Sequence, residues 1–181
     1  MIKTLFLSTV WALPEMCGAK FLTRFRRDVL LDVCGKDCVD VLVAYWKKNE
    51  TPEEVHVYYE CTFKNLPQQL TNIINGNVHF ISEAYNRRVL DMIKENDYKL
   101  LVYDDAAFGK LSGIIKEKYP DIMQIAMYHG VEKQFAQSMY SGSWKNRLRF
   151  YQYNAMIRSE YKQAQNVDAN IMLNNRDADN F

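Results

Sequence analysis

His129 and Glu132 follow the apolar run at residues 122–128 and are separated only by a glycine and a valine. Imidazole and carboxylate groups are common carriers of charge and protons in catalysis. A position just past a buried strand is also where open α/β sheets bind their ligands. We therefore predict that His129 and Glu132 are catalytic. The competing interpretation for His129 is a buried, hydrogen-bonded core histidine.

Four further candidates lie at the ends of predicted strands. Asp104 and Asp105 end the run at residues 99–105, where they could bind a polyhydroxylated substrate or only cap a helix and carry a solvated charge. Gly18 and Lys20 lie where the first strand turns into the first helix. A glycine there lets backbone N–H groups approach a phosphate or sugar, although it could also make only a tight turn. We predict that these four residues bind substrate.

Alternating apolar runs and amphipathic stretches must position these residues. The predicted strands are 3–10, 39–45, 55–63, 99–105, 122–129 and 169–173, and the predicted helices are 19–34, 66–74, 82–95, 109–119 and 146–165, with another helix opening at 176. Short, nearly all-apolar strands in β-then-α order are typical of a parallel sheet covered on both faces. We predict a single α/β domain over residues 1–181, a Rossmann-like open sheet of about six mostly parallel strands with helices on both faces.

Composition excludes several classes of protein. The 181 residues are 48% hydrophobic and carry a formal net charge of +1, which fits one globular domain and gives no overall field for nucleic acid. Lys3 and the apolar residues after it resemble a short signal peptide, but the residues before Cys17 are not the small ones that cleavage requires. We therefore predict a buried first strand, cytosolic thiols rather than disulfides, and a cytoplasmic location.

Common cofactor motifs are absent from the sequence. There is no P-loop, no G-x-G-x-x-G after the first strand and no G-x-S-x-G, and the three histidines lack metal-ligand spacing. Asp177 and Asp179 form a D-x-D, but in the first turn of a predicted helix, where carboxylates are favoured anyway. We predict neither a metal ion nor a cofactor.

Basic and aromatic residues alternate between residues 140 and 162. We predict a surface for an anionic membrane or an acceptor at Trp144, Lys145, Arg147 and Arg149. Each cation near lipid headgroups contributes about 1 kcal/mol. The first helix adds Lys20, Arg24, Arg26 and Arg27. The alternative is an ordinary core-facing helix with a basic outer face, and nucleic acid binding is a weaker third choice because no binding motif accompanies the patch.

The order of these features resembles a known family. Strand five ends in HGVE, a basic segment RLRFYQYNAMIRSEYKQAQ follows, and VDANIMLNNRDADNF ends the chain. The same order of H-x-x-E, R-x-E helix, strand and helix is found in the N-terminal domain of GT-B-fold glycosyltransferases, especially the retaining family 4 group. The matching residues are His129 and Glu132, Arg158 and Glu160, and residues 168–177. The loop at residues 11–18 departs from the pattern, with one glycine where many relatives have two.

This resemblance implies a two-domain enzyme of which the chain is the acceptor-binding half. The nucleotide-sugar donor would bind mainly to a C-terminal domain that the 181 residues do not include, so the chain alone is expected not to transfer sugar. His129 would help to orient the transferred sugar and to stabilise the departing phosphate, and Gly18 would face the cleft. Acceptors in this group are often glycans or lipid-linked precursors of lipopolysaccharide or capsule, and no metal is required.

Two other classes of protein stay open. A complete flavodoxin-like or receiver-like module would bind a ligand or partner without catalysis, and Asp104-Asp105 is suggestive of acidic receiver sites. However, Ser8 and Thr9 stand where such sites need acidic residues. A stand-alone Rossmann enzyme with a nucleotide cofactor is disfavoured by the missing glycine fingerprint.

Overall fold

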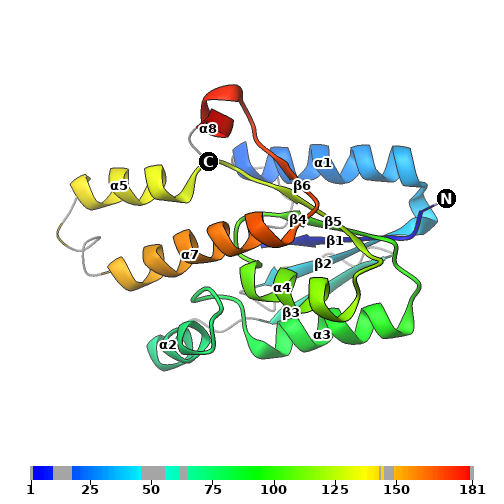
Figure 1. Ribbon diagram of the computed structural model, residues 1–181, viewed down its shortest axis with the longest axis horizontal. Coiled ribbons are helices and arrows are strands. Elements are labelled where there is room, and N and C mark those ends of the chain that lie inside the picture. Colours follow the sequence, from blue (N-terminus) through cyan, green and yellow to red (C-terminus); the bar gives the residue numbers. More distant parts are fainter. Residues whose placement is uncertain are drawn as a thin grey trace.

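Six parallel strands form one open sheet in the computed structural model, which describes residues 2–9, 18–45, 56–61, 65–142, 144 and 149–179 (Figure 1). The strands are β1 (Thr4–Ser8), β2 (Val39–Tyr45), β3 (Val57–Cys61), β4 (Leu100–Asp104), β5 (Met123–Met127) and β6 (Ala169–Ile171). Their order is β3-β2-β1-β4-β5-β6, and every neighbouring pair is parallel. The predicted α/β class and Rossmann-like sheet are confirmed.

Successive side chains of a strand point to opposite faces, and both faces are buried at the centre of the sheet. In β1 all five residues are buried; Leu5 and Leu7 belong to one apolar cluster, whereas Phe6 belongs to a second cluster with Leu30. The larger cluster, which contains Leu5 and Leu7, also includes Tyr103 of β4 and the helical residues Tyr85 and Leu111. The near-continuous apolar character of the strands follows from this double burial.

The helices divide between the two faces of the sheet. They are α1 (Gly18–Cys34), the 3₁₀ turn η1 (Lys36–Cys38), α2 (Leu66–Ile74), α3 (Glu83–Glu95), α4 (Gly109–Lys118), α5 (Glu132–Gly142), α7 (Phe150–Asn166) and α8 (Asn175–Asp179). Figure 1 shows α1 on one side of the sheet and α3 and α4 on the other. As predicted, the Ser82 side chain caps α3, accepting from the backbone N–H of Tyr85 at 3.1 Å.

Helices α4 and α7 approach each other closely because of a glycine. A Cβ atom on Gly109 would lie 2.3 Å from the backbone oxygen of Ser159. The backbone N–H of Gly109 instead donates to Oγ of Ser159 at 2.9 Å. This contact fixes α7 against the helix that follows β4.

Two features of the helices differ from the sequence-based expectation. Helix α5 was not predicted; among its described side chains only Ala136 is an apolar residue buried in the core, so the segment lacks a clear apolar period. Helix α1 forms as predicted, but of its regularly spaced apolar residues only Leu30 is buried. No helix in the described ranges is long and apolar enough to span a membrane.

Candidate functional site

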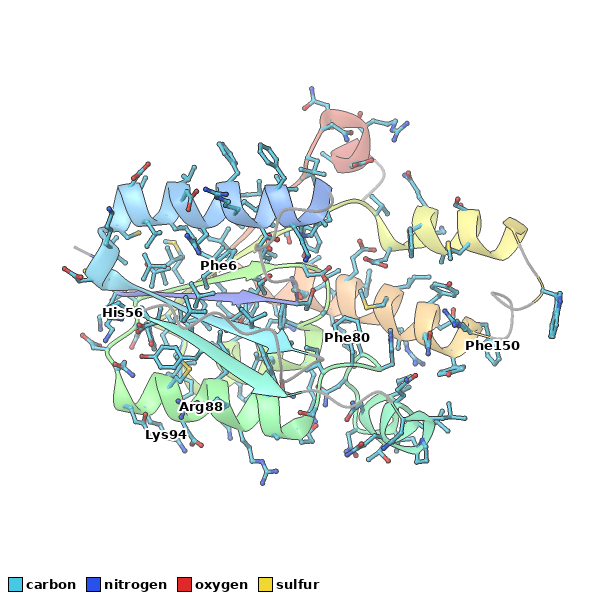
Figure 2. All side chains as sticks on the ribbon, turned by 180° about the vertical axis from the view of Figure 1, so that it is seen from behind. Phe6, His56, Phe80, Arg88, Lys94 and Phe150 are labelled. Carbon is cyan, nitrogen blue, oxygen red and sulfur yellow. The ribbon has the colours of Figure 1, made fainter. Side chains whose placement is uncertain are left out.

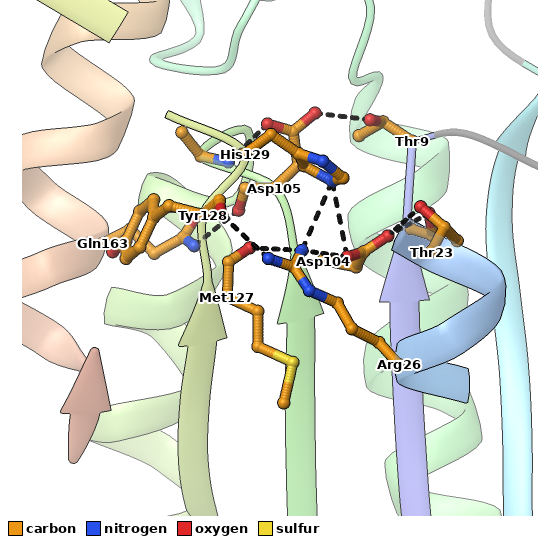
Figure 3. Close-up of polar contacts among 11 residues, drawn as sticks. Thr9, Thr23, Arg26, Asp104, Asp105, Met127, Tyr128, His129 and Gln163 are labelled. Carbon is orange, nitrogen blue, oxygen red and sulfur yellow. Dashed lines mark hydrogen bonds and ion pairs between the residues drawn. The ribbon is translucent and has the colours of Figure 1, made fainter. Parts of the chain in front are cut away.

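The carboxyl ends of β1 and β4 meet at the centre of the sheet, where the strand order reverses. From β1 the chain continues to β2 on one side, and from β4 it continues to β5 on the other. Open α/β sheets bind ligands in the crevice at such a switch point. The register places Ser8 beside Asp104 there, followed by Thr9 and Asp105 (Figure 3).

Asp104 is fully buried and accepts hydrogen bonds from three side chains. The hydroxyls of Ser8 and Thr23 donate to Oδ2 at 3.1 and 2.5 Å, and Nη1 of Arg26 donates to Oδ1 at 2.5 Å. The Arg26 side chain is only 7% exposed, so the two residues form a buried ion pair. Asp104 therefore belongs to a buried hydrogen-bond network. The alternative prediction of a solvated charge that caps a helix does not apply to it.

Arg26 links helix α1 to the end of β5. Its Nη2 donates to the backbone oxygen of Tyr128 at 2.8 Å, and its Nη1 donates to that of Met127 at 3.2 Å. These carbonyl groups belong to the two residues before His129, so Arg26 anchors the backbone that leads into it. The sequence-based assignment of Arg26 to a basic outer surface is therefore wrong, because this residue faces the sheet.

His129 lies two residues beyond β5, at the solvent side of the network. Its Nε2 is 3.4 Å from Oδ1 of Asp104 and 3.4 Å from Nη1 of Arg26, and its side chain is 22% exposed. The imidazole is thus held by protein groups on one side and open to a ligand on the other.

The pKa values of His129 and Asp104 shift in opposite directions. Burial alone would lower the pKa of His129, but the hydrogen bond and charge of Asp104 outweigh it and raise the pKa above 6.5. For Asp104, burial would raise the pKa, but the interactions with His129, Thr23 and Arg26 outweigh it and lower the pKa below 3.8. The pair consequently favours an ionised carboxylate beside an imidazolium.

Asp105 is anchored separately from Asp104. Its carboxylate accepts from the Thr9 hydroxyl at 2.5 Å and from the backbone N–H of Ala106 at 2.6 Å. The side-chain amide of Gln163, from α7, donates to its backbone oxygen at 2.7 Å. Burial raises the pKa of Asp105, against the opposing effects of Thr9 and His129.

Two glutamates complete the cluster from the side of α5 and α7. Oε1 of Glu160 accepts from the backbone N–H of Glu132 at 2.9 Å, so a side chain of α7 satisfies the first residue of α5. Burial, together with the charges of Asp105 and Glu160, raises the pKa of Glu132 to about 8. Burial raises that of Glu160 to about 7, helped by Asp105. Carboxyl groups that stay protonated near neutral pH can donate hydrogen bonds or protons to a ligand.

Gly18 and Lys20 lie on the first turn of α1, before Thr23 and Arg26. Gly18 is the exposed first residue of α1, and a Cβ added there would have no heavy atom within 4 Å. Lys20 is half-buried on the same first turn. The predicted glycine loop at residues 11–17 lies outside the described residues. The α1 side chains that reach the network are Thr23 and Arg26.

The predicted basic-aromatic surface is only partly described. Trp144 is 66% exposed and Arg149 is exposed at the start of α7, whereas Lys145 and Arg147 lie outside the described residues. Arg149 is close enough to His79 to add to the effect of burial, which lowers the pKa of that histidine to about 4.

Sequence reasoning missed Thr9, Thr23, Arg26 and Glu160 as site residues. A usable signal did exist for two of them, because Thr23 and Arg26 share a helical face with Leu30 and Cys34. Had that face been taken as the buried one, Arg26 would have been expected beneath the strand ends. In the described part of the chain, no group of three or more histidine, cysteine or acidic residues could hold a metal ion.

The geometry thus defines a candidate active site made of His129, Asp104, Arg26, Asp105 and Glu132. Its polar groups converge at the position where the fold binds ligands, and their pKa values are shifted by specific neighbours. No protein-family model matches the chain, and a search of curated proteins finds no match either.

Proposed function

We propose that the chain is the acceptor-binding domain of a glycosyltransferase that moves a sugar from a nucleotide-sugar donor to a glycan or lipid-linked acceptor in cell-surface polysaccharide synthesis. The observation that carries the proposal is the His129 imidazole, which is paired with ionised Asp104 beside the switch point of a Rossmann-like sheet. The ordered motifs around His129, Glu132 and Glu160 support it further.

The charges of the network suit the chemistry of sugar transfer. In this reaction the bond from the sugar to the donor diphosphate breaks, and negative charge grows on the leaving phosphate oxygen. An imidazolium held in place before the reaction stabilises such a charge without reorganisation. Arg26 and a protonated His129 both lie beside the ionised carboxylate of Asp104, which holds the two cations in place at the site.

The carboxyl-rich side of the site suits a hydroxyl-bearing acceptor. Glu132, with a pKa of about 8, is protonated at neutral pH and can donate a hydrogen bond to a sugar oxygen. Asp105 accepts from the Thr9 hydroxyl, and the remaining lone pairs of its carboxyl oxygens can accept from a ligand hydroxyl. Such a mixture of donors and acceptors is what recognition of a polyhydroxylated ligand requires.

The strand order argues against the flavodoxin-like or receiver-like alternative. Flavodoxin-like sheets have the order 2-1-3-4-5, whereas this sheet has the order β3-β2-β1-β4-β5-β6 of the Rossmann class. In addition, the charge of Asp104 is already matched by Arg26, which leaves no open acidic pair at the end of β4.

A transfer assay with matched variants tests this proposal. The protein joined to its donor-binding domain is incubated with nucleotide-sugars and cell-envelope lipid extracts, and glycosylated products are detected by mass spectrometry. His129→Ala should lower turnover by about 100-fold or more, as expected for the loss of a group that stabilises transition-state charge. The 181-residue chain alone should give no transfer.

The control is a histidine in a similar pair at the opposite end of the sheet. Nδ1 of His56 is 2.9 Å from Oδ1 of Asp40, and His56 immediately precedes β3 (Figure 2). His56 has φ 65°, so asparagine, which tolerates this conformation, is the suitable replacement. His56→Asn should keep turnover. A robust rate from the isolated chain, or equal losses of turnover and stability in His129→Ala, would contradict the proposal.

A further inference from the structure

The outer face of α1 carries a row of exposed apolar side chains. Phe21, Phe25, Val29 and Val33 are 61%, 58%, 43% and 77% exposed. Their spacing of four residues aligns them along one side of the helix. The buried residues of α1 lie on the opposite side, against the sheet. Figure 2 shows side chains of α1 projecting away from the sheet. Such a continuous apolar row on a surface helix marks an interaction site.

A second row on the same helix carries charges in a polarised order. Lys20, Arg24, Asp28 and Asp32 also repeat every four residues, each one position before a member of the apolar row. The amino-terminal half of this charged row is positive and its carboxyl-terminal half is negative. Arg24 and Asp28 lie 3.6 Å apart within the chain.

A shallow groove separates the two rows. It is lined by Phe21 and Phe25 on one side and by Arg24 and Asp28 on the other. Rows of side chains at a spacing of four residues pack into such grooves when two helices meet. The outer face of α1 therefore has the shape that accepts another helix.

We propose that the chain forms a two-fold symmetric homodimer in which the α1 helices of two copies pack antiparallel. In this arrangement Phe21 meets Val33 of the second copy, and Phe25 meets Val29. Each contact joins a large side chain to a small one, which fills the interface evenly. The same surface serves both copies, as a two-fold interface requires.

The charged row is complementary to itself in the same arrangement. Lys20 lies opposite Asp32 of the second copy, and Arg24 lies opposite Asp28. The charged row has its midpoint at residue 26 and the apolar row at residue 27, which are about 1.5 Å apart along the helix. A single two-fold axis near these residues therefore pairs both rows. A parallel arrangement would bring like charges together, which disfavours it.

The charge balance favours a second copy over a lipid surface. An anionic membrane is bound by a surplus of cations, whereas the charged row has two residues of each sign. A single pair of 17-residue helices is about 26 Å long, so the interface is small. We expect a dissociation constant on the order of 10 µM.

Sedimentation velocity from about 1 to about 200 µM protein measures the association. The native chain should convert from monomer to dimer over this range. Phe25→Asp should raise the dissociation constant by roughly 100-fold or more, because each dimer loses two central aromatic contacts. The control is Ile74→Asp on α2, since Ile74 is 83% exposed and outside the two rows; this variant should still dimerise. Circular dichroism verifies that both variants are folded.

Charge reversal tests the antiparallel geometry. Arg24→Asp and Asp28→Arg should each raise the dissociation constant by roughly tenfold or more, because like charges then face each other across the axis. An equimolar mixture of the two variants should form a heterodimer, since each reversed charge meets its opposite. A monomeric native chain at the highest concentration would overturn the proposal. So would an unchanged dimer in Phe25→Asp, or a mixture that stays monomeric.

Discussion

Replacement of Asp104 by asparagine tests the buried network most severely. The side chain of Asp104 is fully buried, and it accepts from Ser8, Thr23 and Arg26. Asparagine keeps the shape but removes the charge, and its NH₂ group faces donors that it cannot satisfy. The guanidinium of Arg26, which is 7% exposed, then remains buried without a counter-charge.

The expected cost follows from the contacts that remain. Removal of one partner from a buried ion pair costs about 3–5 kcal/mol. Arg26 keeps its hydrogen bonds to the backbone oxygens of Met127 and Tyr128, so the lower end applies. We predict a loss of about 3 kcal/mol in the free energy of unfolding, which lowers Tm by roughly 6–12 °C in a domain of this size.

Urea denaturation at neutral pH, followed by circular dichroism, measures this loss. Asp91→Asn is the matched control, because Asp91 forms an exposed ion pair with Lys94 at 3.5 Å. The control should change stability by less than about 0.5 kcal/mol. Arg26→Met combined with Asp104→Asn should cost less than the sum of the single changes, since neither charge is then left alone. A loss below about 1 kcal/mol in Asp104→Asn would refute a network held by a buried ion pair.

Four more outcomes follow from the site and from the helices that support it. In an NMR titration, the pKa of His129 should lie above 6.5 and should fall in Asp104→Asn, because the main cause that raises it is gone. Because its pKa is raised in the folded chain, His129 contributes its full stabilisation below pH 6.5 and loses it as the pH rises through the folded pKa. His129→Gln should therefore lower the free energy of unfolding more at about pH 5.5 than at about pH 8.5. Burial raises the pKa of Glu160 from 4.5 to about 7, so ionisation of this carboxyl destabilises the fold as the pH rises through that range. Glu160→Gln should therefore be about 2 kcal/mol more stable than the native chain at about pH 8. This gain should vanish toward about pH 4, where Glu160 is protonated in both the folded and the unfolded chain. Gly109→Ala should lower the free energy of unfolding in urea by about 1–3 kcal/mol, because the added Cβ would lie 2.3 Å from a backbone oxygen of α7. Gly130→Ala is the control and should be tolerated, since a Cβ there has no heavy atom within 4 Å. Equal effects of the two alanines would contradict this packing.

The central strands could be predicted from the sequence because they are short and nearly all apolar. The predicted run at residues 39–45 coincides with β2, and the predicted helix at 66–74 coincides with α2. A parallel sheet buries both faces of its strands, so the apolar pattern and the fold have the same cause. The positions of Asp104 and His129 at the carboxyl ends followed from these strands.

The partners of Asp104 could not be predicted in the same way. Thr23 and Arg26 point inward to the ionised carboxylate of Asp104, which is a tertiary contact, and their shared face with Leu30 and Cys34 was only a weak local signal for it. The apolar row at Phe21 and Phe25 was the stronger local signal for the buried face, and it points outward. Helix α5 was also missed because its start depends on a tertiary contact. The backbone N–H of its first residue, Glu132, donates to the side chain of Glu160, which lies 28 residues later in the chain.

We propose that the cluster around His129 and Asp104 binds the sugar-bearing ligand. The most direct measurement follows the imidazole resonances of His129 by NMR while cell-envelope oligosaccharides are added to the chain. These resonances should shift and saturate, together with backbone signals of Asp105 and Glu132, and Asp104→Asn should weaken the binding. Saturable glycan binding that leaves the His129 resonances unmoved would contradict it.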